Sequence, residues 1–67
     1  MAIARVTEIS STSTESFDDA IKQGVARATK TLRNVKSAWV KEQRVDLDNG
    51  EISEYQVNLM VTFVLDE

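Results

Sequence analysis

The feature that most constrains this chain of 67 residues is a pair of long segments, 35–47 and 52–65, joined through Asn49-Gly50. Asn-Gly favours a two-residue type I′ turn, because both positions of that turn need a positive φ. In 52–65, apolar and polar residues alternate, which is typical of a strand with one packed face and one wet face. We therefore predict a long β-hairpin that carries Trp39, the only tryptophan, in its first strand.

The two-residue loop also predicts the register of the hairpin. One face then holds four opposing pairs, namely Gln43 with Gln56, Lys41 with Asn58, Trp39 with Met60, and Ser37 with Thr62. Ala38 and Val40 share the other face with the apolar residues of 52–65, and we expect a helix to cover that face. Trp39 is therefore predicted on the face that points away from the helix.

A short strand and a helix are predicted before the hairpin. β-Branched residues dominate 3–9 and favour a strand. The serine and threonine residues of 10–14 are typical of a polar connecting loop. From about Thr14 to Arg33, apolar residues recur at the spacing of one helical face. The chain is thus predicted to contain both a helix and a sheet.

The two ends of this helix carry their own signals. Thr12 or Ser13 is the predicted N-cap, and Thr12 with Glu15 matches a capping box. Asn34 is the residue expected to take a left-handed conformation at the other end. Gly24 lies within the apolar stripe, where it costs about 1 kcal/mol relative to alanine. Its presence indicates that the helix backbone approaches the sheet closely.

The composition excludes several kinds of chemistry. The chain has no cysteine and no histidine, which excludes disulfides, thiolate catalysis, Cys/His metal sites and histidine acid–base catalysis. We find no nucleophile set and no glycine-rich phosphate loop, so we predict no enzyme activity and no catalytic residues. The net charge of −3 argues against nucleic acid as a partner. The apolar run near Met1 is too short for a signal peptide or a membrane span, so we expect a cytoplasmic protein.

The size of the chain points to self-association. Residues 1–67 form one domain, near the size at which a single core is marginal. The predicted helix would be roughly 30 Å long, whereas the hairpin strands would span roughly 43–46 Å. One helix cannot cover such a sheet, so its remaining apolar surface must meet something other than water, and self-association is the simplest answer.

Three residues of the hairpin are candidates for ligand binding, each with an ordinary structural alternative. Trp39 is either an aromatic residue buried between subunits or a platform on which a planar ligand stacks. Gln56 is either a polar residue of a wet face or a partner for the edge of a heteroaromatic ring. Arg44 either binds a phosphate or pairs with a surface carboxylate.

The acidic turn at 46–51 has a superficial likeness to the start of a calcium loop, because oxygen-bearing side chains alternate there. The distant glutamate of an EF-hand is missing, and the hairpin explains Asn49-Gly50 fully. We therefore assign no metal ligands.

Six motifs follow one another over nearly the whole length of the chain. They are Thr12-Ser13, Ala26-Arg27-Ala28, Lys30-Thr31-Leu32-Arg33, Val40-Lys41-Glu42 with Arg44, Glu54-Tyr55-Gln56-Val57, and the closing Phe63 and Leu65. In this order and over this length, they resemble the dodecin family. The resemblance implies an α+β subunit of β-α-β-β order, with a three-stranded antiparallel sheet wrapped around one long helix. It further implies a hollow homododecamer that binds FMN or a riboflavin-type flavin for storage or sequestration and is not an enzyme.

The resemblance also assigns roles to individual residues. Gln56 aligns with the glutamine that bonds the isoalloxazine edge, and Arg44 with an arginine near the ligand phosphate. The flavin-stacking tryptophan of the family aligns with Ser37, and an arginine of some bacterial members aligns with Val64. Trp39 is then a displaced stacking platform, or the chain forms a shell without flavin that has a structural or calcium-binding role, as linked to some relatives without the tryptophan.

Overall fold

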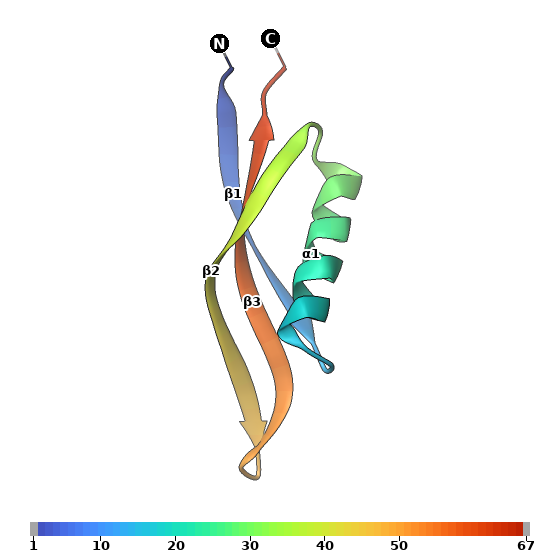
Figure 1. The fold of residues 1–67 in the computed structure, drawn as a ribbon, viewed down its shortest axis with the longest axis vertical. Coiled ribbons are helices and arrows are strands. Elements are labelled where there is room, and N and C mark those ends of the chain that lie inside the picture. Colours follow the sequence, from blue (N-terminus) through green and yellow to red (C-terminus); the bar gives the residue numbers. More distant parts are fainter. Residues whose placement is uncertain (1, 67) are drawn as a thin grey trace.

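The structure is a computed structural model of the chain, and it describes residues 2–66. Figure 1 shows one helix along one face of a long twisted sheet, with both ends of the chain at the same end of the molecule. The elements are β1 (Ala4–Ser13), α1 (Phe17–Thr31), β2 (Val35–Asp48) and β3 (Glu51–Val64). The three strands are antiparallel, in the order β1-β3-β2. The predicted β-α-β-β fold is confirmed.

β1 is longer than predicted. Residues 10–13, which we expected in a polar loop, pair with β3, from Ser10 opposite Asn58 to Ser13 opposite Tyr55. Pairing with the central strand of the sheet has overridden the local turn preference of serine and threonine. The loop prediction for 10–14 is therefore wrong for all but its last residue, and Ser10 becomes part of a sheet face.

α1 consequently begins later than predicted. Its N-cap is Ser16, whose Oγ accepts a hydrogen bond from the backbone N–H of Asp19 at 3.0 Å. Thr12 and Ser13 are not the cap, because both are held in β1. Ser13 instead donates its hydroxyl hydrogen to Asp19 Oδ2 at 2.6 Å. This bond ties the end of the strand to the first turn of the helix.

The core is small and lies between α1 and β3. Its fully buried apolar residues are Ala20, Ala28, Val57, Leu59 and Val61. Gly24 allows the helix to come this close, because a Cβ there would lie 2.9 Å from Leu59 Cδ1. The predicted close approach is confirmed.

Asn34 follows the end of the helix and has a φ of 60°. Its predicted left-handed conformation is also confirmed.

The hairpin turn has the predicted form. Asn49 and Gly50 have φ values of 52° and 80°, and Asp48 pairs directly with Glu51. Both central residues thus have the positive φ of a type I′ turn. The predicted two-residue loop between β2 and β3 is confirmed.

The register along the hairpin is correct only in part, because the ladder contains bulges. An extra residue in β3, Ser53, shifts the pairing by one, so Arg44 rather than Gln43 lies opposite Gln56. The predicted pairs Gln43–Gln56 and Lys41–Asn58 are therefore wrong. An extra residue in β2, Lys41, then restores the register, and beyond it Trp39 lies opposite Met60 as predicted. Ser37 also lies opposite Thr62 as predicted.

One chain alone is elongated and incompletely buried. It measures 51 × 19 × 13 Å, and its radius of gyration is 13.8 Å, against about 11 Å for a compact domain of this length. Its accessible surface is 4918 Å², against about 4,200 Å² for a compact monomer of this mass. Large apolar side chains lie exposed along its whole length, namely Ile3, Val6, Trp39, Val40, Leu47, Ile52 and Leu65.

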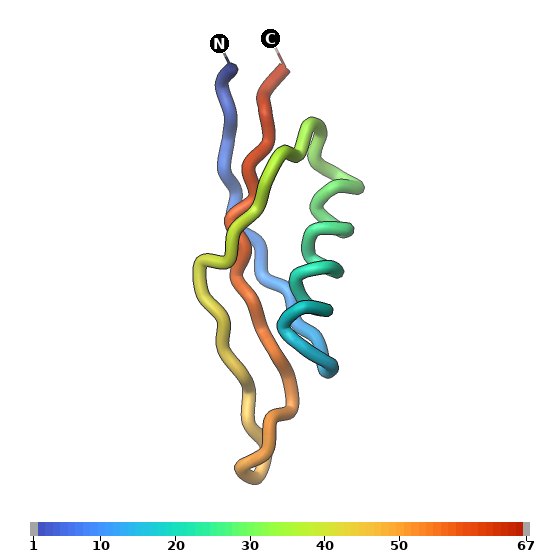
Figure 2. Tube along the Cα trace, in the orientation of Figure 1, coloured from blue at the N-terminus to red at the C-terminus, as the bar shows by residue number. Residues whose placement is uncertain are grey.

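The mismatch in length between helix and hairpin explains this exposure. α1 has 15 residues, or about 22 Å at 1.5 Å per residue. β2 and β3 have 14 residues each, or about 46 Å. Figure 2 shows the hairpin end running well past the helix. No helix within residues 2–66 is long and apolar enough to cross a membrane.

Candidate functional site

The face of the sheet that points away from α1, here called the open face, carries the candidate residues. Strand pairing arranges its side chains in four rows across β1, β3 and β2. The rows are Thr12–Gln56–Arg44, Ser10–Asn58–Glu42, Glu8–Met60–Trp39 and Val6–Thr62–Ser37. All four predicted site residues, Gln56, Arg44, Trp39 and Ser37, therefore lie on one face.

The Lys41 bulge is what makes this possible. Along a regular strand, Trp39 and Arg44 would point to opposite faces, because they are five residues apart and side chains alternate. The extra residue at Lys41 adds one position between Val40 and Glu42. Such bulges commonly redirect side chains near functional surfaces. Here the bulge makes Trp39, on one side of it, and Arg44, on the other, point to the same face, the open face.

Gln56 is the centre of a polar network at one end of the open face. Its Oε1 accepts a hydrogen bond from Arg44 Nε at 3.1 Å, and its Nε2 donates to Ser10 Oγ at 2.9 Å. A longer bond of 3.4 Å joins Nε2 to Asn58 Oδ1. The partners come from all three strands, so the orientation of the Gln56 amide is fixed by the whole sheet.

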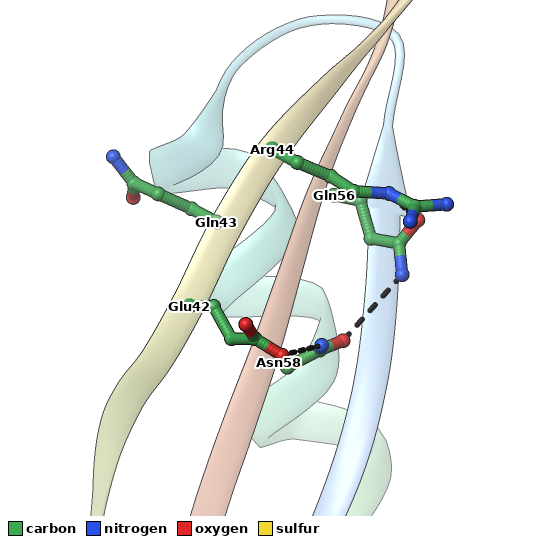
Figure 3. A pocket seen from close by; sticks show the side chains of 5 residues that line it. All are labelled: Glu42, Gln43, Arg44, Gln56 and Asn58. Carbon is green, nitrogen blue, oxygen red and sulfur yellow. Dashed lines mark hydrogen bonds between the residues drawn. The ribbon is translucent and has the colours of Figure 1, made fainter.

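A second part of the network holds Asn58. Its Nδ2 donates to Glu42 Oε1 at 3.1 Å. Figure 3 shows Arg44 converging on Gln56 and Glu42 converging on Asn58, while Gln43 points away from them. The carboxylate of Glu42 therefore orients the Asn58 amide, which in turn presents its oxygen to Gln56.

The network leaves defined hydrogen-bonding capacity at its surface. Both N–H groups of Gln56 Nε2 are engaged, but its Oε1 can accept a second bond. Ser10 accepts from Gln56, so its own hydroxyl hydrogen remains available. Arg44 uses Nε here, which leaves its terminal nitrogens available as donors. The network thus offers one acceptor, Gln56 Oε1, and two donors, the Ser10 hydroxyl and the Arg44 guanidinium. This set is complementary to a planar group whose N–H is flanked by two carbonyl oxygens.

The hollow at this network is small. It has a volume of about 110 Å³ and is lined by Glu42, Gln43, Arg44, Gln56 and Asn58. Sites that enclose a drug-sized ligand have volumes of about 300–1,000 Å³. The open face of one chain therefore provides one wall of a site, and a second surface is needed to enclose a ligand.

Trp39 lies farther along the open face, with half of its surface exposed (50%). Its partner Met60 is four residues from Gln56 along β3, about 13 Å at 3.3 Å per residue. Ser37 is opposite Thr62, six residues from Gln56, or about 20 Å. The structure thus brings Arg44 and Gln56 into contact and places Trp39 and Ser37 at increasing distances from them.

An ion pair crosses the sheet between these two regions. Lys41 Nζ lies 3.3 Å from Glu8 Oε1, so the side chain of the bulge residue reaches from β2 over the central strand to β1. Both side chains are about half exposed, and such a pair contributes little to stability. The Lys41–Glu8 ion pair lies between Gln56 and Trp39, so it separates the polar network of the open face from the tryptophan.

Sequence reasoning missed Ser10, Asn58 and Glu42. Asn58 could have been found, because it lies two residues after Gln56 in β3 and therefore on the same polar face. Ser10 carried none, because the serine run was assigned to a loop and its pairing with β3 is a long-range contact. Glu42 was hidden by the bulge, which reverses the face that simple alternation gives it.

The acidic hairpin turn does not gather ligands within one chain. Asp46 opposes Glu54 and Asp48 opposes Glu51 across the ladder. Within residues 2–66, no three carboxylates lie close enough together to hold a metal ion.

Comparison with known proteins gives consistent matches. The family model described as Dodecin matches residues 3–66. A dodecin of Thermus thermophilus is 43% identical over 60 residues, which is 90% of this chain and 87% of that protein. The solved structure of dodecin from Streptomyces davaonensis is 44% identical, with a TM-score of 0.92 over 98% of this chain and 97% of that one.

A more distant solved relative is a calcium-binding protein. It is a calcium dodecin from Mycobacterium tuberculosis, described as calcium-chelating with a novel calcium-binding site. It is 28% identical, with a TM-score of 0.83 over 96% of this chain and 91% of that one. Together with the family model, which spans all but a few residues, these matches show that the chain belongs to the dodecin family.

Proposed function

We propose that this protein binds a flavin, FMN or a related riboflavin-type molecule, on the open face, and stores or sequesters it without acting as an enzyme. We further propose that it does so as a hollow homododecamer. The observation that carries the proposal is the Gln56 amide, held from three strands beside Arg44 on an uncovered sheet face. Membership of the dodecin family supports the same assignment.

The chemistry of the network fits the isoalloxazine ring. The pyrimidine edge of a flavin has one N–H between two carbonyl groups. Gln56 Oε1 would accept from that N–H, and the hydroxyl of Ser10 and the guanidinium of Arg44 would donate to the carbonyl oxygens. Alternatively, Arg44 would hold the phosphate of FMN by charge-assisted hydrogen bonds, because its bond to Gln56 uses Nε and leaves the terminal nitrogens as donors.

The network binds only the edge of the isoalloxazine ring, and the flat face of the ring needs a stacking surface. Trp39 is the aromatic side chain of the open face, and stacking on an indole would add affinity. The family resemblance implies that Ser37 occupies the position of the stacking tryptophan, yet Ser37 is about 20 Å from Gln56 along the same chain. That distance exceeds the length of the three-ring system. A flavin held at the Ser37 position would therefore take its Gln56 from a second copy.

Two measurements on the purified protein test this proposal. Light scattering or native mass spectrometry should give the mass of twelve chains. Titration of FMN with the protein should quench the flavin fluorescence to a saturable end point, because stacking on Trp39 quenches it. A colourless protein that leaves FMN fluorescence unchanged contradicts flavin binding, and a monomer contradicts the assembly.

The second candidate function is a shell without flavin that has a structural role or binds calcium. The calcium-chelating relative favours it, and so does the serine at position 37. The carboxylates at the hairpin turn lie in separate opposing pairs, so a calcium site would combine carboxylates from several copies. A calcium-dependent rise in the thermal midpoint, together with no quenching of FMN, would support this function over the first.

A further inference from the structure

The end of the β2–β3 hairpin is an unpartnered extension of the helix-side face. Leu47 and Ile52 oppose each other there, with 64% and 51% of their surfaces exposed. Leu47 shares its face with Val45, which pairs with Tyr55, and Tyr55 contacts Phe17 of α1 edge-to-face. The apolar stripe that α1 covers therefore continues past the helix with nothing on it in this chain.

The same hairpin end concentrates negative charge. Its carboxylates form two directly opposed like-charge pairs, Asp46 with Glu54 and Asp48 with Glu51. Opposed like charges in a sheet are destabilising. Arg44 Nε lies 3.8 Å from Asp46 Oδ1, but among the described residues no ion pair reaches Asp48, Glu51 or Glu54, and residues 45–55 contain no basic side chain. Ser53 is the extra residue of β3, and its hydroxyl donates to the backbone oxygen of Asp46 at 3.1 Å. We call residues 46–54 the acidic tip.

Positive charge is concentrated in another segment of the chain. Residues 20–36, which include most of α1 and the start of β2, carry no carboxylate and five basic side chains, Lys22, Arg27, Lys30, Arg33 and Lys36. Among the described residues, only Arg33 of these five pairs with a carboxylate, Asp66, at 3.1 Å. The net charge of −3 thus conceals two regions of opposite sign.

The two regions cannot neutralise each other within one chain. Figure 1 shows the acidic tip at one end of the molecule and the end of α1 that leads into β2 toward the other. Even the start of α1, where Phe17 contacts Tyr55, is four residues of β3 from Glu51, or about 13 Å at 3.3 Å per residue, whereas a Debye length at physiological salt is about 8 Å. Opposite charges so far apart attract other copies of the chain rather than each other.

A groove beside the basic segment could bind Leu47 and Ile52, the apolar residues of the tip. It lies between α1 and β2, has a volume of about 330 Å³, and has a mainly apolar lining that includes Ile21, Val25, Val35, Ala38 and Val61. Lys36, an extra residue of β2, also lines it. Lys22 does not line the groove itself but directly follows Ile21 of the lining on α1. An apolar groove with these two cations beside it complements an apolar pair bordered by carboxylates.

We infer that the acidic tip of one copy docks into the α1–β2 groove of the next, with Leu47 and Ile52 against the apolar lining and Asp48 and Glu51 toward Lys22 and Lys36. The two surfaces differ, so the contact is head-to-tail and closes into a ring when the rotation allows it. This inference rests on the proposed self-assembly and is independent of flavin binding. It identifies which surfaces of the chain join the copies.

Charge reversal and its rescue test the contact. The tip variant Asp48→Lys/Glu51→Lys should raise the concentration at which half of the assembly dissociates by at least tenfold. The groove variant Lys22→Glu/Lys36→Glu should do the same. A chain that carries all four substitutions should recover most of the wild-type assembly. Mass photometry over a dilution series at low salt measures each of these concentrations.

Two further variants separate docking from folding and from net charge. Glu15→Lys/Asp18→Lys changes the net charge as the tip variant does, but away from the tip, and should assemble as the wild type does. Leu47→Ser should weaken assembly without changing the circular dichroism spectrum, because Leu47 lies outside the core. If the wild type assembles but the tip and Leu47→Ser variants assemble equally well, the docking inference is wrong while the proposed assembly stands. If the wild type is a monomer, both are wrong.

Discussion

Arg44 Nε donates a hydrogen bond to Gln56 Oε1 at 3.1 Å, although regular pairing from the hairpin turn would set Gln43 opposite Gln56. The extra residue Ser53 in β3 produces this contact by shifting the ladder one position. The extra residue Lys41 in β2 reverses the shift, so Trp39 still faces the same way. Two compensating bulges therefore place an amide, a cation and an aromatic ring on one face.

Replacement of Gln56 tests the amide directly. Gln56→Leu should weaken FMN binding by roughly 5–150-fold, because a hydrogen-bonding partner removed from a desolvated site costs about 1–3 kcal/mol. Fluorescence quenching titrations measure the change. The matched control is Gln43→Leu, the same substitution on a side chain that points away from the network. Equal losses in both variants would show that Gln56 has no specific role.

Replacement of Trp39 tests the stacking platform. Trp39→Leu should weaken FMN binding by roughly 5–100-fold, since stacking of a base on an aromatic side chain contributes about 1–3 kcal/mol. Trp39→Phe keeps an aromatic face and should retain most of the affinity. Unchanged affinity and quenching in Trp39→Leu would place the stacking surface elsewhere on the assembly.

Gly24→Ala should destabilise the fold even though alanine favours helices. The added Cβ would lie 2.9 Å from Leu59 Cδ1 and 3.1 Å from Ser11 Cβ, in a closely packed region. Overpacking of this kind typically costs about 1–3 kcal/mol, against about 1 kcal/mol gained in helix propensity. The midpoint of urea unfolding should fall.

The double variant Gly24→Ala/Leu59→Val is the control for this steric argument. Valine lacks the Cδ1 atom that the new Cβ would meet, so the double variant should lose less stability than the two single changes added together. A Gly24→Ala variant that unfolds at higher urea than the wild type would rule out the close contact.

Gly50→Ala should destabilise the hairpin through the backbone alone. Gly50 has a φ of 80°, and no atom lies within 4 Å of the position that a Cβ would take. A non-glycine residue in a left-handed conformation costs roughly 1–2 kcal/mol. Gly50→Asn is the control, because asparagine tolerates this conformation better and should lose less. Thermal midpoints that are equal for both variants would argue against the type I′ geometry.

The hairpin, the buried face of β3 and the close approach of α1 to the sheet were predictable from local signals. Asn49-Gly50 set the turn and the ends of both hairpin strands, because only a few residue pairs accept two positive φ values. The alternation in β3 identified its buried face, which contains Val57, Leu59 and Val61. Gly24 indicated close helix–sheet packing, since its cost in a helix needs a compensating contact. Each of these signals acts between neighbours in the sequence.

The composition of the open face depended on the tertiary structure. Ser10 joined the site because pairing with β3 outweighed the turn preference of a serine run. Glu42 and Arg44 joined it because unpaired residues at Ser53 and Lys41 changed the register, and a bulge leaves no periodic trace in a single sequence. The sequence by itself therefore identified the candidate ligand contacts Gln56, Arg44 and Trp39. Long-range strand pairing decided which of them face the same way, because register is a property of two strands together.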